Sequence, residues 1–201
     1  MQRVLPLARM LGSSVTLEEW AALDEDDPRE LVDGGLEDAE VPSVLHEVLV
    51  TWLQLLLGPY FRERGGTTLG AVRLAIPPRR GRVPDLACYH AGSPLPLEGV
   101  VTTPPDVVIE VVSGRPEDER RDRIAKPQDY AELGSPRYWI VDPWLRTLEI
   151  FELDDRRRYV RVLAATSGVL EPVPGLPDLK LDVDAMWAEI ARVGGGSKVE
   201  G

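Results

Sequence analysis

The sequence predicts a domain of the α/β or α+β class, in which a mixed sheet packs against helices. Segments of strand length and longer amphipathic segments follow one another in the order helix, strands, helix, strand, hairpin. The segment at residues 107–112 is apolar on both alternation phases, as in a strand that is covered on both faces. The chain has 201 residues and shows no internal repeat or linker. We therefore expect one domain over residues 1–193 and a flexible tail over residues 194–201.

The first part of the chain is expected to hold two helices and a hairpin. A capping-box pattern at residues 16–19 starts a short helix that ends near residue 23. Asp-Gly-Gly at residues 33–35 predicts a hairpin-like turn with a weak return strand, because polar and acidic residues follow it. The longest helix is expected from Pro42, in its first turn, to about Arg64. Its apolar stretch is too short and too interrupted to span a membrane, which predicts a core helix.

Three strands are expected in the middle of the chain. Alternating apolar residues predict strands over residues 70–76 and 83–89, separated by a loop over residues 77–82. The single cysteine, Cys88, lies in the second of these strands and is expected to be buried. A loop rich in proline and glycine then leads to the strand at residues 107–112.

The last part of the chain is expected to begin and end with a helix. A charged helix runs from about Pro116 to Leu133, and Gly134 ends it. A closing helix begins at Asp182 or Asp184. Between the two helices lie three strands, of which the first two form a hairpin. These strands cover residues 137–143, 148–153 and 158–164.

The charge balance limits the possible partners. Lys and Arg total 23 and Asp and Glu total 34, which gives a net charge of −11. The molecule as a whole does not attract a polyanion, so a role with nucleic acid needs local basic clusters or bound metal ions. One cysteine excludes an internal disulfide and fits a reducing compartment. The N-terminus lacks a signal-peptide pattern, and we expect a cytoplasmic protein.

A carboxylate, Glu110, stands in the middle of the predicted buried strand. A lone ionised carboxylate there costs several kcal/mol unless it is paired. Asp85, at the start of another strand, can lie beside it, whereas Asp106 is roughly 13 Å away at ~3.3 Å per residue. Two converging carboxylates would bind Mg²⁺ or Mn²⁺. The alternative is that Asp85 caps a turn and Glu110 pairs with an arginine.

The charged helix carries a row of polar residues on one face. Asp122, Lys126 and Tyr130 are spaced i, i+4 and i+8, so their side chains point the same way. Lys126 could be aimed at the carboxylate pair and stabilise charge there. Alternatively, Asp122 and Lys126 form a solvated ion pair above a packed tyrosine. The residues alone leave the two readings open.

The segments "VPDLACY" and "PDVVIEVVSGRPEDERRDRIAKPQDYAELGSPRYWIVDP" resemble the Uma-two family of bacterial endonucleases, in the PD-(D/E)XK superfamily. The resemblance implies a restriction-endonuclease-like fold in which Asp85 and Glu110 are the motif acids and metal ligands. The superfamily's lysine position holds Val112 here, and Lys126 matches the lysine that the family carries on the next helix. Pro127, which disfavours a helix at the residue before it, is a departure from the family pattern.

Further candidate residues follow from the resemblance and from position. His46 is expected on the inward face of the long helix. It is either a site residue or a buried histidine that bonds a backbone carbonyl. Glu30 matches an acidic position of the family's opening motif. The arginines that precede Asp85 could meet phosphates or belong to a solvated loop. They are Arg79, Arg80 and Arg82, with Arg73 further upstream.

These observations predict a metal-dependent endonuclease whose substrate is DNA. Asp85 and Glu110 would hold one or two Mg²⁺ or Mn²⁺ ions, and Lys126 would stabilise developing charge. A homodimer is expected from the base rate of soluble oligomers and from the superfamily. The alternative is a non-catalytic interaction or regulatory module that retains the nuclease fold, which the net charge, Val112 and Pro127 favour.

Overall fold

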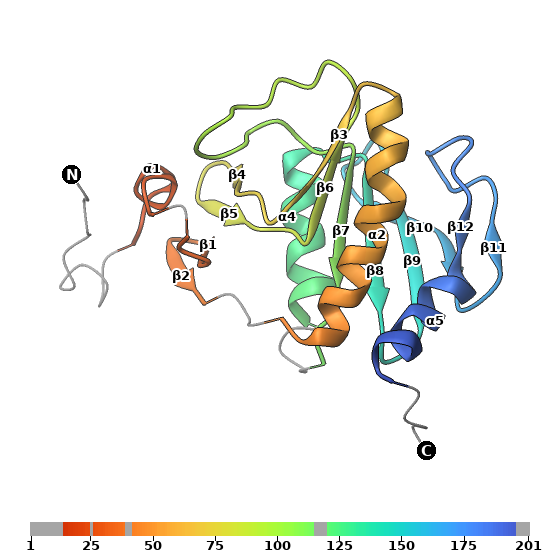
Figure 1. Ribbon diagram of the computed structural model, residues 1–201. Coiled ribbons are helices and arrows are strands. Elements are labelled where there is room, and N and C mark those ends of the chain that lie inside the picture. The colour runs from red at the N-terminus through yellow and green to blue at the C-terminus, as the bar shows by residue number, and fades with distance from the viewer. Residues whose placement is uncertain (1–13, 25, 39–41, 115–119, 196–201) are drawn as a thin grey trace.

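The computed structural model describes residues 14–24, 26–38, 42–114 and 120–195. The predicted mixed sheet flanked by helices is confirmed (Figure 1). The tail predicted at residues 194–201 lies mostly outside the described residues, as does the expected start of the charged helix at Pro116.

A six-stranded sheet in the order β10-β9-β8-β7-β6-β3 forms the centre of the molecule. Its neighbours are antiparallel except for β7 and β8, which are parallel. The strands are β3 (Thr67–Gly70), β6 (Leu86–Tyr89), β7 (Val107–Val111), β8 (Arg137–Asp142), β9 (Thr147–Leu153) and β10 (Tyr159–Ala165). A parallel pair of strands needs a crossover connection. Between β7 and β8 this connection includes the helical segment at residues 121–133.

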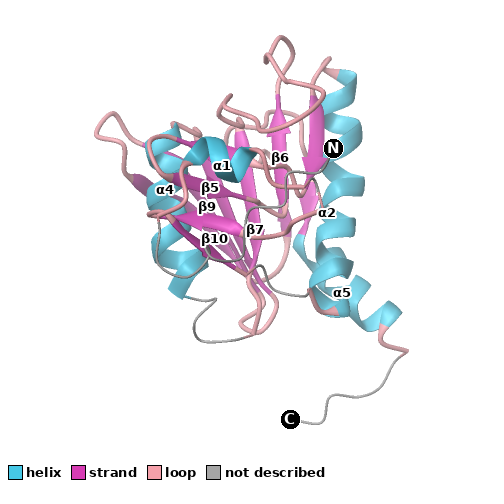
Figure 2. Ribbon diagram, turned by 90° about the vertical axis from the view of Figure 1, so that its left-hand side faces the viewer, coloured by secondary structure: helices cyan, strands magenta, loops and turns pink. Residues whose placement is uncertain are grey.

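Helices cover the sheet on both faces (Figure 2). On one face lie α2 (Val44–Glu63) and α5 (Val183–Val193), which pack on Val107, Ile109 and Val111. On the other face lies α4 (Lys126–Leu133), and this core holds Val108 and Val112. Alternate residues of β7 therefore enter two different cores, which explains why both phases of this strand are apolar.

A second sheet carries the N-terminal part of the chain. Its strands follow the order β2-β1-β5-β4, all antiparallel. They are β1 (Glu30–Val32), β2 (Gly35–Glu37), β4 (Leu74–Ile76) and β5 (Arg80–Arg82), preceded by α1 (Leu17–Ala21). A two-stranded sheet of β11 (Val169–Leu170) and β12 (Leu181–Asp182) lies near the C-terminus.

Several predicted elements need correction. Of the predicted strand at residues 70–76, only residues 74–76 form β4, and Gly70 ends β3, which begins at Thr67 and belongs to a different sheet. The predicted loop at residues 77–82 contains β5. Pro42 precedes the N-cap of α2, which is Ser43, instead of lying in the first turn. The return strand β2 forms in spite of its polar sequence because it pairs along its whole length with β1.

The expectation that the apolar stretch of α2 is too short to span a membrane is wrong, because α2 is long and apolar enough by length and composition alone. Leu49, Leu53, Leu57 and Phe61 on one side of it are fully buried in the core. The helix therefore packs as the core helix that its sequence predicts.

Candidate active site

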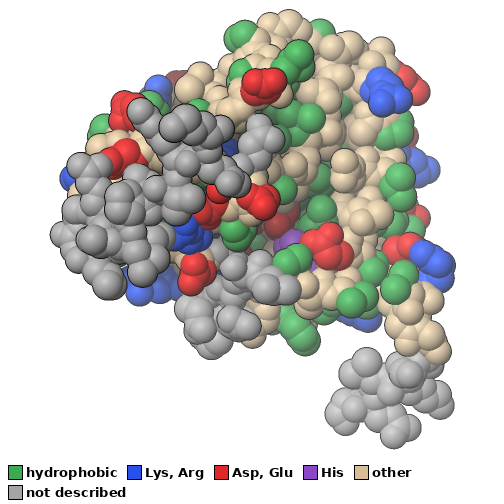
Figure 3. Space-filling view, turned by 60° about the vertical axis from the view of Figure 1, so that its left-hand side comes forward, with side chains coloured by type: hydrophobic (Ala, Val, Ile, Leu, Met, Phe, Trp, Pro, Cys, Tyr) green, Lys and Arg blue, Asp and Glu red, His purple; other side chains and the backbone are tan. Residues whose placement is uncertain are grey.

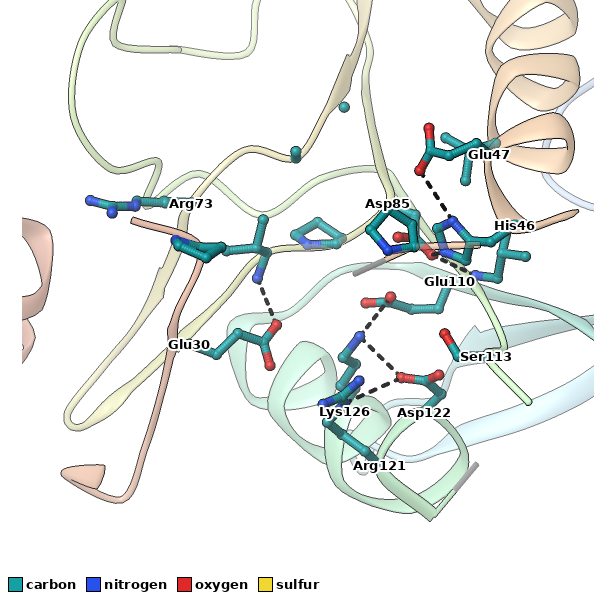
Figure 4. Close-up of a pocket in the computed structure, with 18 of the residues that line it drawn as sticks. Glu30, His46, Glu47, Arg73, Asp85, Glu110, Ser113, Arg121, Asp122 and Lys126 are labelled. Carbon is teal, nitrogen blue, oxygen red and sulfur yellow. Dashed lines mark hydrogen bonds and ion pairs between the residues drawn. The ribbon is translucent and has the colours of Figure 1, made fainter. Parts of the chain in front are cut away.

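A cavity of about 490 Å³ opens where the first turn of α2 meets the ends of β6 and β7 (Figure 4). Seven of its lining residues are acidic and three are Arg or Lys. The acidic residues are Asp26, Asp27, Glu30, Glu47, Asp85, Glu110 and Asp122, and the basic ones are Arg73, Arg121 and Lys126. Figure 3 shows acidic and histidine side chains side by side on this face of the molecule.

Glu110 lies on the central strand β7 and is 1% exposed. Its Oε2 accepts a hydrogen bond of 2.7 Å from Lys126 Nζ, and its Oε1 accepts one of 2.6 Å from the Tyr130 hydroxyl. The partner of the buried carboxylate is therefore a lysine on the following helix, and no arginine of the described residues is among its contacts. Its neighbour two positions along the chain, Val112, is buried in the core.

Asp85 precedes β6 and is held by two donors. Its Oδ2 accepts a hydrogen bond of 2.7 Å from the backbone N–H of Val111 and lies 3.1 Å from Nε2 of His46. Among the described residues its Oδ1 has no hydrogen-bond partner. Asp85 thus presents a free oxygen at the cavity, while its other oxygen joins α2 to the end of β7.

His46 lies on the inward face of α2, as its position predicts, and is 8% exposed. Its partners are carboxylates: besides Asp85, Glu47 Oε1 lies 3.3 Å from its Nδ1. Burial lowers the pKa of His46, but the two carboxylates outweigh burial and the net shift is upward. The expected alternative, a backbone carbonyl partner, is wrong for this histidine.

The row Asp122, Lys126 and Tyr130 turns toward Glu110, as the i, i+4, i+8 spacing predicts (Figure 4). Lys126 Nζ also lies 3.0 Å from Asp122 Oδ1. Lys126 and Asp122 are 6% and 3% exposed, so the reading as a solvated ion pair is wrong. Within the described residues, Glu110 has side-chain bonds from the tyrosine and the ammonium, and Asp122 holds the ammonium from the other side.

Pro127 does not misdirect Lys126. A π-helical turn, Arg121–Ala125 (η2 in the labels used here), precedes α4, and the backbone N–H of Lys126 bonds to Arg121 O. Pro127 then lies in the first turn of α4, where a missing N–H donor costs nothing. Since π-helical turns shift the face that a helix presents, this local geometry fits the contact between Lys126 and Glu110.

Electrostatics in the cavity are dominated by burial. Burial raises the pKa of Glu110 to about 8, and the Lys126 ammonium opposes this shift without cancelling it. Burial lowers the pKa of Lys126, but the surrounding carboxylates outweigh burial and raise it, which keeps the ammonium charged. The pKa of Asp122 is raised, mainly by burial. Without a metal ion, burial therefore favours the protonated form of Glu110 up to about pH 8, in spite of the Lys126 ammonium.

Glu30 and the arginines of β5 form a separate network beside the cavity. Arg82 is 1% exposed and donates to Glu30 Oε2 and Asp129 Oδ2, each at 2.7 Å. Arg80 pairs with Asp129 and lies 3.1 Å from Asp33. The expectation that Arg82 meets phosphates is therefore wrong, because its guanidinium is buried between two carboxylates. Arg79 is exposed and donates to Ser14.

The donor set fits a magnesium ion bound through two carboxylates. Among the described residues no group of three or more His, Cys, Asp or Glu side chains is arranged to hold a metal ion. Mg²⁺ commonly takes one or two protein carboxylates and completes its shell with water and substrate phosphate oxygens. Asp85 Oδ1 has no hydrogen-bond partner among the described residues, and Glu110 lines the same cavity. These two side chains would hold such an ion.

Some cavity residues were not predicted from the sequence. Glu47 contacts His46 and lines the cavity. Ser113 and Arg121 also line it. Asp129, the buried partner of Arg80 and Arg82, carries no local signal, because its partners lie 49 and 47 residues away in sequence.

Comparisons with known proteins identify a family and a similar fold. The family model Uma2, described as "Putative restriction endonuclease", matches residues 15–184. Among solved structures, one described as a putative nuclease belonging to DUF820, from Anabaena variabilis ATCC 29413, superposes with a TM-score of 0.70 at 16% identity. The match covers 88% of this chain and 99% of the other. At that identity the likeness shows a shared fold. No curated protein matches the chain.

Proposed function

The chain belongs to the Uma2 family, because the family model matches most of its length, and from this premise we propose that it is a metal-dependent endonuclease that hydrolyses DNA. One observation carries the proposal. Asp85 and Glu110, from neighbouring strands, face one cavity in which a lysine contacts Glu110 directly. The family's description and a solved relative described as a nuclease support this class of reaction.

Asp85 and Glu110 would hold the metal ion, Mg²⁺ or Mn²⁺. When bound, such an ion lowers the pKa of a coordinated water and offsets the negative charge of the phosphate. In the hydrolysis, a water oxygen forms a bond to phosphorus, the bond from phosphorus to one bridging oxygen breaks, and that oxygen leaves with a proton.

The remaining residues position these groups. His46 and the N–H of Val111 fix one oxygen of Asp85, so its other oxygen points to the cavity. Tyr130 fixes Glu110 by donating to Oε1. Lys126 would stabilise the extra negative charge on the phosphate during bond breaking, because its ammonium is buried, charged and already oriented by Glu110 and Asp122.

The test is cleavage of supercoiled and linear DNA by the purified protein with Mg²⁺ or Mn²⁺. Asp85→Asn should abolish cleavage. Lys126→Ala should lower turnover by roughly 10²–10³-fold, the usual loss when one preorganised donor is removed. Lys126→Arg should restore activity only in part, since the guanidinium is broader than the ammonium. Lys180→Ala, which changes an exposed lysine, is the matched control. Full activity of Asp85→Asn, or no cleavage by the wild type with either ion, would overturn the proposal.

The second candidate is a non-catalytic module with the nuclease fold. It is favoured by the existing ion pair of Glu110 with Lys126, which gives the carboxylate a partner without any metal ion. Calorimetric titration with Mn²⁺ separates the two candidates. A nuclease site binds the ion, and Asp85→Asn abolishes that binding, whereas a module of this kind shows no heat of binding.

A further inference from the structure

The turn between β8 and β9 carries exposed large apolar side chains. Trp144 and Leu145 are 63% and 62% exposed. Ile124, in the π-helical turn, is 55% exposed. The adjacent Arg123 bonds Asp142 at 2.8 Å, which links this turn to the one that carries Trp144. Exposed apolar residues that lie together mark contact sites more often than isolated ones do.

The tip of this turn is held firmly. Asp142 Oδ1 accepts hydrogen bonds of 2.9 Å from the backbone N–H groups of Trp144 and Leu145. The indole of Trp144 lies against Gly114 so closely that a Cβ at Gly114 would come within 2.7–2.8 Å of three indole atoms. The ring is therefore supported from the protein side while most of its surface faces solvent.

The turn lies at the end of the sheet where the cavity opens. β7 and β8 are parallel, with Val111 opposite Val141, so the chain leaves both strands at the same end (Figure 1). Ser113 lines the cavity, and the next residue, Gly114, contacts Trp144. Gly114 thus connects Trp144 to the lining of the cavity that holds Asp85 and Glu110.

The negative net charge of the protein favours a contact with nucleic acid that does not depend on charge. The net charge is −11, and Arg80, Arg82 and Arg123 are engaged by carboxylates of the protein itself. Of the three basic residues that line the cavity, Lys126 pairs with Glu110 and Asp122, and Arg73 donates to three backbone carbonyls, so a nucleic-acid strand gains from contacts of another kind. Stacking of a base on an aromatic ring supplies binding energy that does not depend on charge or on base identity.

We propose that Trp144 is the stacking platform for a nucleobase next to the cleaved bond. This inference rests on the proposed function and adds the nature of its substrate. A base inside a duplex has both faces covered by its neighbours, so Trp144 selects DNA with an unpaired base, such as a single strand, a flap or a frayed end. The ring anchors the strand, and the carboxylates and Lys126 act on the phosphate beside it.

The first test compares the kinetics of cleavage of a labelled single-stranded oligonucleotide with Mn²⁺. Trp144→Ala should raise KM by roughly 5- to 150-fold, the range expected from the loss of one base stack, and change kcat little. Trp144→Phe keeps a ring and should retain most of the affinity. Leu145→Ala, which removes an equally exposed apolar neighbour without a ring, should leave KM unchanged.

An oligonucleotide with abasic positions shows whether the ring contacts a base. Scanning a single abasic position along the strand should find one position that raises the wild-type KM as much as Trp144→Ala does. On that oligonucleotide Trp144→Ala should have no further effect, because the two changes remove the same contact. Gly114→Ala, which pushes the indole from its support, should raise KM in the wild type but not in the Trp144→Ala variant.

The failures can be told apart. An unchanged KM for Trp144→Ala overturns the stacking role and leaves the proposed nuclease function standing. Absence of cleavage by the wild type overturns the proposed function, and the inference with it. If Trp144→Ala leaves KM unchanged and turns a dimer into a monomer in light scattering, the turn is a contact between two copies of the chain, and the inference is overturned.

Discussion

Glu110 shows how a buried charge can be kept in a sheet. Its partners, Lys126 and Tyr130, come from the helix that crosses over between β7 and β8, so the strand itself can stay apolar. Val112 fills the core at the place where the superfamily pattern has its lysine. Lys126 thus lies 16 residues after Glu110 in the sequence and contacts it in the folded protein.

The free energy of unfolding of the metal-free protein should depend on pH because Glu110 titrates. Its folded pKa of about 8 lies above the unfolded value, so the folded state binds more protons between about pH 4.5 and pH 8. The contribution of Glu110 to stability therefore falls as the pH rises through this window. Glu110→Gln cannot titrate, and its stability relative to the wild type should rise by up to about 1.4 kcal/mol per pH unit. Urea unfolding in EDTA from pH 5 to pH 9 measures this, and a flat difference would contradict it.

Cys88 should be unreactive in the folded protein. It is fully buried in β6, as the sequence predicts, and burial raises the pKa of its thiol to about 12. The thiolate, which is the reactive form, is therefore scarce at pH 8. A thiol reagent such as a disulfide dye should label no cysteine before urea is added and one cysteine afterwards. Labelling at the rate of a free thiol in native buffer would show that the strand opens readily.

Residues with a periodic pattern could be predicted from the sequence, and residues with distant partners could not. Glu110 stood out in an apolar strand, and Lys126 and Tyr130 shared a helical face. The bond between His46 and Asp85 spans 39 residues, and that between Arg82 and Glu30 spans 52. Such pairs depend on how the two sheets and α2 pack, which a local pattern does not encode.

At the level of elements, β5 shows the limit of hydrophobic periodicity. Its sequence, Arg-Gly-Arg, has no apolar residue to alternate. It becomes a strand because β4 and β1 pair on its two sides. Trp20 packs so close to Gly81 that a Cβ there would lie 2.4 Å from the indole. The charged triplet therefore forms a strand because β4 and β1 pair with it and because Gly81 leaves room for Trp20.

Arg82 should contribute strongly to stability, because it joins β5, on which it lies, to β1 and α4. Arg82→Met leaves Glu30 of β1 and Asp129 of α4 buried without their shared cation. Removing one partner of a buried ion pair costs about 3–5 kcal/mol, so a loss of this size is expected in urea unfolding. Arg79→Met, on the exposed side of the same turn, should change stability by less than about 0.5 kcal/mol. Equal effects of the two substitutions would contradict the assigned role.

The charge of the whole molecule predicts how it meets DNA. With a net charge of −11 and a cavity lined by seven carboxylates, the metal-free protein repels a phosphate backbone. In EDTA at about 0.15 M salt, where charges are screened beyond ~8 Å, we expect no retention of DNA in a gel-shift assay. Adding Ca²⁺ or Mn²⁺ should restore binding. Binding that is equally strong in EDTA would show that a metal ion does not bridge protein and substrate.

The crossover between β7 and β8 has a consequence for the protein during its own synthesis. A ribosome makes Asp85 and Glu110 before it makes Lys126, since they precede it in the chain. A nascent chain that ends before α4 therefore has both acidic side chains and lacks the ammonium that pairs with one of them. Strand β8, the parallel neighbour of β7, comes later still. An incomplete translation product thus has a half-built sheet and lacks the lysine, so the proposed activity requires a chain that extends at least through α4 and β8.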